Sequence, residues 1–246
     1  MKSLADGYGY NERLFSGGLR SRLHLARFKW FQSELKGLDS PIDTVLELGC
    51  FDGKLIDYFP NKPSRYVGFD ANWEGGLDIA RERWANEQDY AFLQASSPSE
   101  MHLKDSDAFH IAVAMETLEH IPPETLDEYL RKISQHLDGH FFVTVPNEKG
   151  IVLLTKWLIK KALSKDADDY SPGELLNAVL GRLDRITRRD HNGLDHKGFD
   201  YDVLINGMKK YFDVIDISGH PFGFLPPSLC FGIGIIAKTR LPAPSS

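Results

Sequence analysis

Glycine and acidic residues are spaced along this sequence as a site for a ribose-bearing ligand would require. A short apolar run ends in Glu47-Leu48-Gly49, and Gly53 follows closely. Glycine at such a turn lets a ligand approach the backbone, or permits a turn that a side chain would strain. A second apolar run ends in Asp70, and a carboxylate at a strand tip can accept both hydroxyls of a ribose. Together, the glycine turn and the acidic strand tip predict a cofactor site.

Taken alone, the glycine turn is equally expected between any buried strand and the helix that follows it. The dinucleotide fingerprint G-x-G-x-x-G is absent, because Phe51 stands where its second glycine is required. This departure argues against a nicotinamide or flavin enzyme. Cys50, inside the turn, is interpreted as a small packing residue rather than a redox group.

A second group with chemical potential comprises Glu116, Glu119 and His120, which follow a later apolar run. The unperturbed pKa of imidazole suits a proton acceptor near pH 7, so His120 is a candidate general base. Glu119 is a candidate to act with it. A further pair of histidines, His191 and His196, occurs before the next predicted helix.

Alternating short apolar runs and helical patterns must position these groups. The strands are predicted at residues 44–48, 65–69, 90–94, 109–115 and 141–145, with helices at 54–59, 73–86 and 123–136. Strands that alternate with helices of this length imply right-handed crossovers. The predicted fold class is therefore α/β, a Rossmann-like doubly wound and mostly parallel sheet with helices on both faces.

The rest of the chain is divided into three further regions around this core at 41–146. Residues 1–40 form a leader with an amphipathic helix at 19–38, and residues 147–198 form a helical lid inserted after the fifth strand. Residues 199–246 supply a helix at 200–210 and strands at 212–217 and 231–239. These last strands complete a seven-stranded sheet with an antiparallel last strand.

Composition limits the class of protein further. A hydrophobic content of 42% and a charged content of 26% are ordinary for a globular protein. The net charge of −6 argues against a protein whose main partner is nucleic acid. Two cysteines argue against a disulfide framework. Without a signal-peptide pattern or an apolar run of about 18 residues, we expect a soluble, cytoplasmic protein.

The stretch Glu47-x-Gly49-x-x-x-Gly53, together with Asp70, resembles the class I S-adenosylmethionine-dependent methyltransferases over about residues 43–146. The resemblance implies that Gly49, Cys50 and Gly53 border the methionine half of the cofactor and that Asp70 holds the ribose. It places Gln94, Ala95 and Ser96 beside the adenine; the other residues expected near the cofactor are Glu47, Phe51, Ala71, Asn72 and Met115. Phe51 replaces a glycine common in the family, and the third strand lacks the acid that often meets the adenine amine.

The spacing E-x-x-E-H is similar to that of ubiquinone-biosynthesis O-methyltransferases and of small-RNA 3′-terminal 2′-O-methyltransferases. The second likeness implies that Glu116, Glu119, His120 and His196 hold Mg²⁺ or Mn²⁺, with His191 as a rival to His196. Such an ion lowers the pKa of a hydroxyl and orients it. The metal-free alternative leaves Glu119 to orient the cofactor and His120 to act as base or to cap a helix.

The lid and the tail are expected to contact the acceptor. Residues 151–163 fit a cap helix with a buried apolar side, or a basic amphipathic helix in peripheral contact with a membrane or a lipid-linked acceptor. Four arginines could bind an acidic group or form a solvated face: Arg182, Arg185, Arg188 and Arg189. The aromatic and proline-rich residues 219–227 form either a pocket wall or a structural loop.

The function predicted from these features is O-methylation of a small molecule or glycan, with vicinal hydroxyls favoured if a metal is bound. A metal-free N- or C-methyltransferase is the alternative within the enzyme class. The alternative from another class is a non-catalytic scaffold that keeps the cofactor fold. The retained Glu47, Gly49, Gly53 and Asp70 argue against the scaffold.

Overall fold

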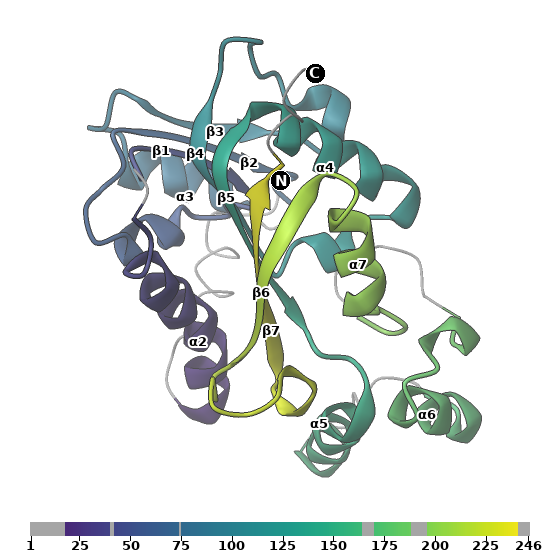
Figure 1. Ribbon diagram of the computed structural model, residues 1–246. Coiled ribbons are helices and arrows are strands. Elements are labelled where there is room, and N and C mark those ends of the chain that lie inside the picture. The colour runs from purple at the N-terminus through teal and green to yellow at the C-terminus, as the bar shows by residue number, and fades with distance from the viewer. Residues whose placement is uncertain (1–17, 40–41, 74, 164–169, 188–195, 241–246) are drawn as a thin grey trace.

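A seven-stranded sheet forms the centre of the computed structural model, which describes residues 18–39, 42–73, 75–163, 170–187 and 196–240. The strand order is β3-β2-β1-β4-β5-β7-β6 (Figure 1). The strands are β1 (Thr44–Leu48), β2 (Arg65–Asp70), β3 (Tyr90–Gln94), β4 (Phe109–Met115), β5 (Leu137–Pro146), β6 (Phe212–His220) and β7 (Gly232–Thr239). The first five are mutually parallel, and β7 pairs antiparallel with both β5 and β6. The predicted fold class is thereby confirmed.

The strand order reverses direction at β1, which lies between β2 and β4. The crossover that follows β1 leads towards β2 and β3, whereas the chain returns to the other side of β1 to form β4. The loops after β1 and β4 therefore diverge at the carboxyl edge of the sheet. In open α/β sheets a ligand binds at such a switch point.

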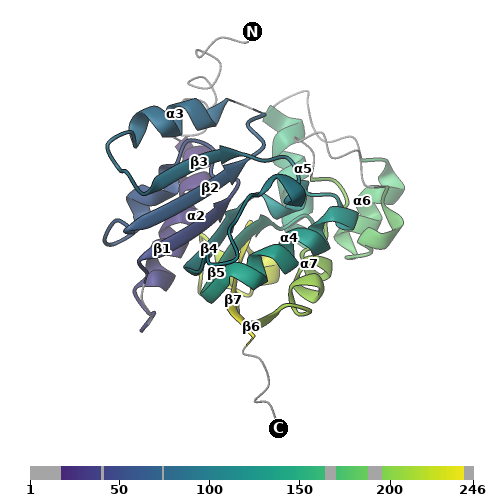
Figure 2. The ribbon, with the colours of Figure 1, turned by 90° about the horizontal axis from the view of Figure 1, so that it is seen from above.

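Helices cover both faces of the sheet, because each presents one apolar side. Helices α2 (Gly18–Leu35) and α3 (Gly76–Arg83) lie on one face, where Phe31 and Leu77 are fully buried. Helices α4 (Pro123–His136) and α7 (Tyr201–Met208) lie on the other, with Ile133 and Leu204 in that core. Figure 2 shows the sheet between α3 and α4.

Beyond the carboxyl edge lie α5 (Gly150–Leu163) and α6 (Pro172–Val179), which share a small core of their own. The short 3-10 turns are η1 (Lys54–Tyr58), η2 (Pro98–Glu100), η3 (Leu118–His120), η4 (Leu183–Arg185) and η5 (Pro227–Leu229). Among the described residues, none of the helices combines the length and apolar character needed to cross a bilayer.

Several element bounds differ from those expected. The helix predicted at 54–59 is the 3-10 turn η1, and α3 begins only after Gly75, which adopts a left-handed conformation at its N-cap. β5 begins at Leu137, because the backbone becomes extended directly after α4. β6 continues to His220, since its pairing with β7 runs along the whole of both strands.

Candidate functional site

The loop after β1 is a tight turn held by backbone hydrogen bonds to the neighbouring strand. The amides of Gly49 and Cys50 both donate to the carbonyl oxygen of Phe69, at 2.7 and 3.2 Å. Gly49, Phe51 and Gly53 have φ angles of 78°, 44° and 67°. Because only glycine adopts this region freely, two of the three positions match the residue that the backbone needs.

The space beside each glycine is taken by another side chain of the protein. A Cβ atom at Gly49 would overlap the Oγ1 atom of Thr117, in the loop after β4. A Cβ atom at Gly53 would lie 2.9 Å from the indole nitrogen of Trp84 and 3.0 Å from the ring of Phe92. The glycines were expected to give a ligand access to the backbone. In the structure they also let Thr117 and Trp84 pack against the turn.

Asp70, at the tip of β2, connects the loops after β1 and β2. Its Oδ2 atom accepts the amide of Phe51 at 3.0 Å, and its Oδ1 atom accepts the amide of Asn72 at 2.6 Å. Burial raises the pKa of Asp70, and the two amide hydrogen bonds partly offset this. A carboxylate has about four lone-pair sites, so both oxygens retain capacity for ligand hydroxyls.

The predicted adenine-side residues lie next to this loop. The Ala95 amide donates to the carbonyl oxygen of Asp70 at 2.9 Å, and the Gln94 side chain donates to that of Ala71 at 3.4 Å. The Ser96 amide donates to the Glu100 side chain at 2.7 Å. The loops after β2 and β3 are therefore adjacent, as a cofactor that spans both would require.

Cys50 and Met115 are both buried near the turn. Cys50 packs over Gly68, where a Cβ atom would lie 2.6 Å from its sulfur. Burial raises the pKa of the Cys50 thiol, which keeps it protonated and agrees with its interpretation as a packing residue. Met115 ends β4, and its sulfur accepts the Thr144 hydroxyl at 3.4 Å.

Glu47 lies within β1, almost fully buried, and its carboxylate accepts the Tyr66 hydroxyl. Burial raises the pKa of Glu47 to about 8. The Tyr66 hydrogen bond lowers this pKa, while Asp52 and Asp70 raise it further. Glu47 therefore holds a proton through most of the neutral range in the protein without a ligand.

Replacing Glu47 by glutamine is expected to flatten the pH dependence of stability. A folded-state pKa near 8, above the ordinary 4.5, means that unfolding releases a proton between these values. The free energy of unfolding therefore falls as pH rises from about 4.5 to 8, by at most about 5 kcal/mol. Urea unfolding of the ligand-free protein at a series of pH values measures this. Glu82→Gln, at an exposed position on α3, is the control; an equally steep decline in Glu47→Gln would contradict the assignment.

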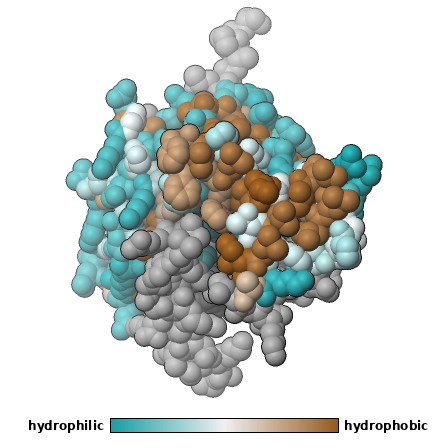
Figure 3. All heavy atoms as spheres, turned by 90° about the horizontal axis from the view of Figure 1, so that it is seen from below, coloured by the Kyte–Doolittle hydropathy of each residue, from teal (hydrophilic) through white to brown (hydrophobic). Residues whose placement is uncertain are grey.

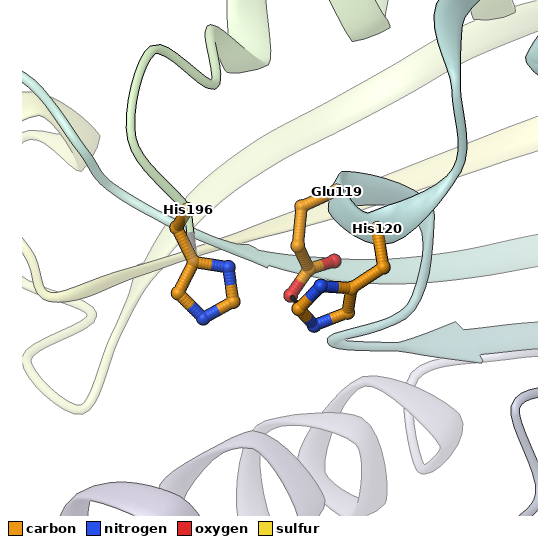
Figure 4. Close-up of side chains that lie close together, drawn as sticks. All are labelled: Glu119, His120 and His196. Carbon is orange, nitrogen blue, oxygen red and sulfur yellow. Dashed lines mark ion pairs between the residues drawn. The ribbon is translucent and has the colours of Figure 1, made fainter. Parts of the chain in front are cut away.

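Glu119, His120 and His196 converge at the carboxyl edge of the sheet (Figure 4). One ligand atom from each lies within 4.8 Å of the others. Glu119 and His120 come from η3, whereas His196 comes from the segment before α7. The rings of His120 and His196 are 4.8 Å apart, and His120 Nε2 is 3.9 Å from Glu119 Oε1. Three of the four predicted metal ligands are thus brought together.

The fourth predicted ligand, Glu116, lies outside this cluster of three. It directly follows β4 with a φ angle of 52°, and its amide donates to the Thr144 carbonyl oxygen at 2.9 Å. Its Oε1 atom is buried, with no hydrogen-bond partner among the described residues. Burial raises the pKa values of both Glu116 and Glu119, and repulsion from Glu116 raises that of Glu119 further. The carboxyl edge of the sheet therefore holds two buried carboxyl groups, those of Glu116 and Glu119.

Four charged or titratable side chains near this cluster were not assigned to the site from the sequence. Lys156 of α5 forms an ion pair with Glu148 at 3.0 Å. Arg27 of α2 partly offsets the raised pKa of Glu116. Burial, together with repulsion from Arg27 and Lys156, lowers the pKa of His220 to about 4. Arg27 is one cation in a helix with several, so no sequence pattern distinguishes it.

The other basic residues considered from the sequence are the arginines around η4 and those that follow them. Arg182 and Arg185, around η4, are exposed, as a solvated face would be. Arg188, Arg189 and His191 lie outside the described residues, as does the stretch from Met1 to Asn11.

The reversed strand order, with three loops meeting at the carboxyl edge, defines a Rossmann-like domain of the class I S-adenosylmethionine-dependent methyltransferase type. Residues 13–177 match the methyltransferase domain family. Since this span exceeds half of the chain, the protein belongs to that family. No curated protein matches the chain.

Similar solved structures carry the same fold. An S-adenosylmethionine-dependent methyltransferase from Clostridium acetobutylicum is 12% identical, with a TM-score of 0.64 and coverage of 94% of this chain and 98% of its own. The methyltransferase domain of bacterial CtHen1 is 14% identical, with a TM-score of 0.54 and coverage of 88% and 99%. Magnesium protoporphyrin IX methyltransferase from Synechocystis, with bound SAH, is 13% identical, with a TM-score of 0.56 and coverage of 96% of each chain. At these identities the likeness shows the fold alone, and the likeness of the E-x-x-E-H segment to two particular groups stays a prediction.

Proposed function

We propose that this protein transfers the methyl group of S-adenosylmethionine to a hydroxyl oxygen of a small-molecule or glycan acceptor, with vicinal hydroxyls favoured. The observation that carries the proposal is the convergence of Glu119, His120 and His196 at the carboxyl edge, next to the switch point of the sheet. The methyl group of a sulfonium is already activated. The protein must therefore mainly position the acceptor oxygen in line with it and exclude water.

The cofactor is proposed to lie across the loops after β1, β2 and β3. Gly49, Cys50, Phe51 and Gly53 would border its methionine half from the β1 loop, between Glu47 on one side and Met115 on the other. Asp70 would hold the ribose, with Ala71 and Asn72 beside it, and residues 94–96 would line the adenine. The hydrogen bonds of Asp70 to Phe51 and Asn72 support this arrangement, because they fix two of these loops together.

A divalent cation fits the Glu119, His120 and His196 set. Two imidazoles and one carboxylate suit Mn²⁺ better than Mg²⁺, which prefers oxygen ligands. Burial of the Glu119 carboxylate raises its pKa, and a cation beside it would compensate the buried charge. Such an ion would lower the pKa of an acceptor hydroxyl and orient it. Glu116 is proposed to contribute through its charge, or as the fourth ligand that the sequence suggested.

The protein's own groups would complete the acceptor site. In the metal-free alternative, His120, whose side chain is 21% exposed, would accept the hydroxyl proton beside Glu119. The Lys156–Glu148 pair and Arg27 would orient polar groups of the acceptor. The net charge of −6 makes nucleic acid a poor acceptor. Two buried free cysteines support a reducing, cytoplasmic compartment.

The direct test is transfer of a labelled methyl group to catechol and to its mono-O-methyl ether, with Mn²⁺ or with a chelator. We expect product from catechol only, and a fall of roughly a hundredfold or more when the ion is removed. Chelator-insensitive transfer would leave a metal-free enzyme that uses His120 as its base. Failure to bind S-adenosylhomocysteine would support the scaffold alternative instead.

A further inference from the structure

An exposed apolar surface lies at one end of the molecule, built from α5 and the loop between β6 and β7. We call it the end patch, and its members are Ile151, Leu158, Ile159, Phe222, Phe224 and Leu229. Phe224 is 84% exposed and Ile151 is 56% exposed. Figure 3 shows apolar side chains gathered in the middle of this face. Large contiguous apolar surfaces are uncommon on proteins without a partner at that place.

The structure holds the two segments of the end patch together from within. The side chain of Asn147, just before α5, donates to the carbonyl oxygens of Ser228 and Cys230, at 3.1 and 3.0 Å. The Cys230 thiol donates to the Phe222 carbonyl oxygen at 3.4 Å. The loop backbone is therefore fixed, while its aromatic side chains point to solvent. The exposed aromatic side chains therefore belong to an ordered loop and are not part of a poorly packed core.

Helix α5 has opposite apolar sides with different environments. Val152 and Leu153 are buried towards the protein, whereas Ile151 and Leu158, seven residues apart and so on one side of the helix, are exposed. A cap helix that served only to bury one apolar side would carry polar residues at these outer positions. The outer apolar side of α5 therefore has no explanation in the packing of the described residues.

Charge around the end patch differs from that of the chain as a whole. The chain has a net charge of −6, yet residues 150–163 and 219–231 contain no Asp or Glu. Lys160 and Lys161 are exposed in the last turn of α5. Apolar and aromatic side chains beside lysines are the features of surfaces that insert into the headgroup region of an anionic bilayer.

We infer that the end patch docks this protein on an anionic lipid bilayer, with Phe222 and Phe224 inserted and Lys160 and Lys161 at the headgroups. The position of the patch gives this docking a consequence. In the sheet, Pro146 and His220 both pair with Gly232, so the segments after β5 and β6 leave from the same carboxyl edge as Glu119. Docking would turn the acceptor side of the sheet towards the bilayer. Membrane docking is a property separate from the proposed methyl transfer.

The test is co-sedimentation of the full chain with phosphatidylcholine vesicles, with and without added phosphatidylglycerol. We expect binding to the anionic vesicles that weakens with salt. Phe222→Ser with Phe224→Ser should weaken binding on the order of a hundredfold, because two large apolar side chains no longer leave water. Lys160→Gln with Lys161→Gln should weaken it about twentyfold. Because all four side chains are exposed, these variants should fold.

The matched control is Val203→Ser with Ile215→Ser, which removes two exposed apolar side chains from α7 and β6. It should bind anionic vesicles as the unchanged protein does. Equal vesicle binding by the Phe222 and Phe224 variant would overturn the inference. A second result would also overturn it: the unchanged protein does not bind vesicles and is a dimer in light scattering, and the Phe222 and Phe224 variant is a monomer. The end patch would then be an interface between two copies of the chain. The readout is binding, so the outcome is independent of whether the methyl-transfer proposal holds.

Discussion

Replacing Glu119 and His196 together by alanine is expected to abolish tight Mn²⁺ binding and to lower methyl transfer by about a thousandfold or more. The two residues supply two of the three ligand atoms that lie within 4.8 Å of one another, so His120 alone would remain. Electron paramagnetic resonance of Mn²⁺, titrated into protein saturated with S-adenosylhomocysteine, measures the site. Labelled methyl transfer measures turnover.

The variant should fold, and this keeps the experiment informative. Burial raises the pKa of Glu119 well above its usual range, because burying this polar group costs stability, and removing the carboxyl group removes that cost. We therefore expect a melting temperature equal to or above that of the unchanged protein. Glu124→Ala with His102→Ala removes the same residue types from exposed positions and should change nothing. Undiminished Mn²⁺ binding in the Glu119 and His196 variant would remove the metal from the proposal.

The order of elements was predictable because local patterns report it directly. Short apolar runs that end in glycine or an acid mark buried strands, and the chain from Thr44 to Pro146 follows that pattern. The position of Asp70 at the tip of β2 was predictable, because it directly follows an apolar run. His196 was expected near His120 through a family resemblance, and the structure brings their rings to 4.8 Å.

Contacts between distant segments were not predictable in the same way. The hydrogen bond from Tyr66 to Glu47 crosses from β2 to β1, and an alternating pattern does not show which side chains meet there. Arg27 lowers the pKa of Glu116, although it lies in helix α2, far from Glu116 in the sequence. The exposure of Phe224 depends on how the β6–β7 loop folds over Asn147. Each follows from tertiary packing, which periodicity along the chain does not encode.

Gly49 was expected to serve the turn and to give a ligand access to the backbone, and its substitution should have a large effect. Gly49→Ala is expected to destabilise the fold by about 2–4 kcal/mol. A φ angle of 78° strains any residue with a Cβ atom, and that atom would also overlap Thr117. Displacing Thr117 moves the loop after β4, so affinity for S-adenosylhomocysteine should fall as well. Urea unfolding and calorimetry measure the two effects.

The two causes of the Gly49→Ala effect are separable with residues that the chain offers. Gly75 has a φ angle of 73° and nothing within 4 Å of the position that a Cβ atom would occupy. Gly75→Ala should therefore cost only the backbone strain, about 1 kcal/mol. Adding Thr117→Ala to Gly49→Ala should recover part of the lost stability, because it removes the overlap with the Oγ1 and Cγ2 atoms of Thr117 and leaves only the Cβ atom, at 2.9 Å. If Gly49→Ala costs no more than Gly75→Ala, the loops after β1 and β4 are not in the close contact described, and the glycine serves the turn alone.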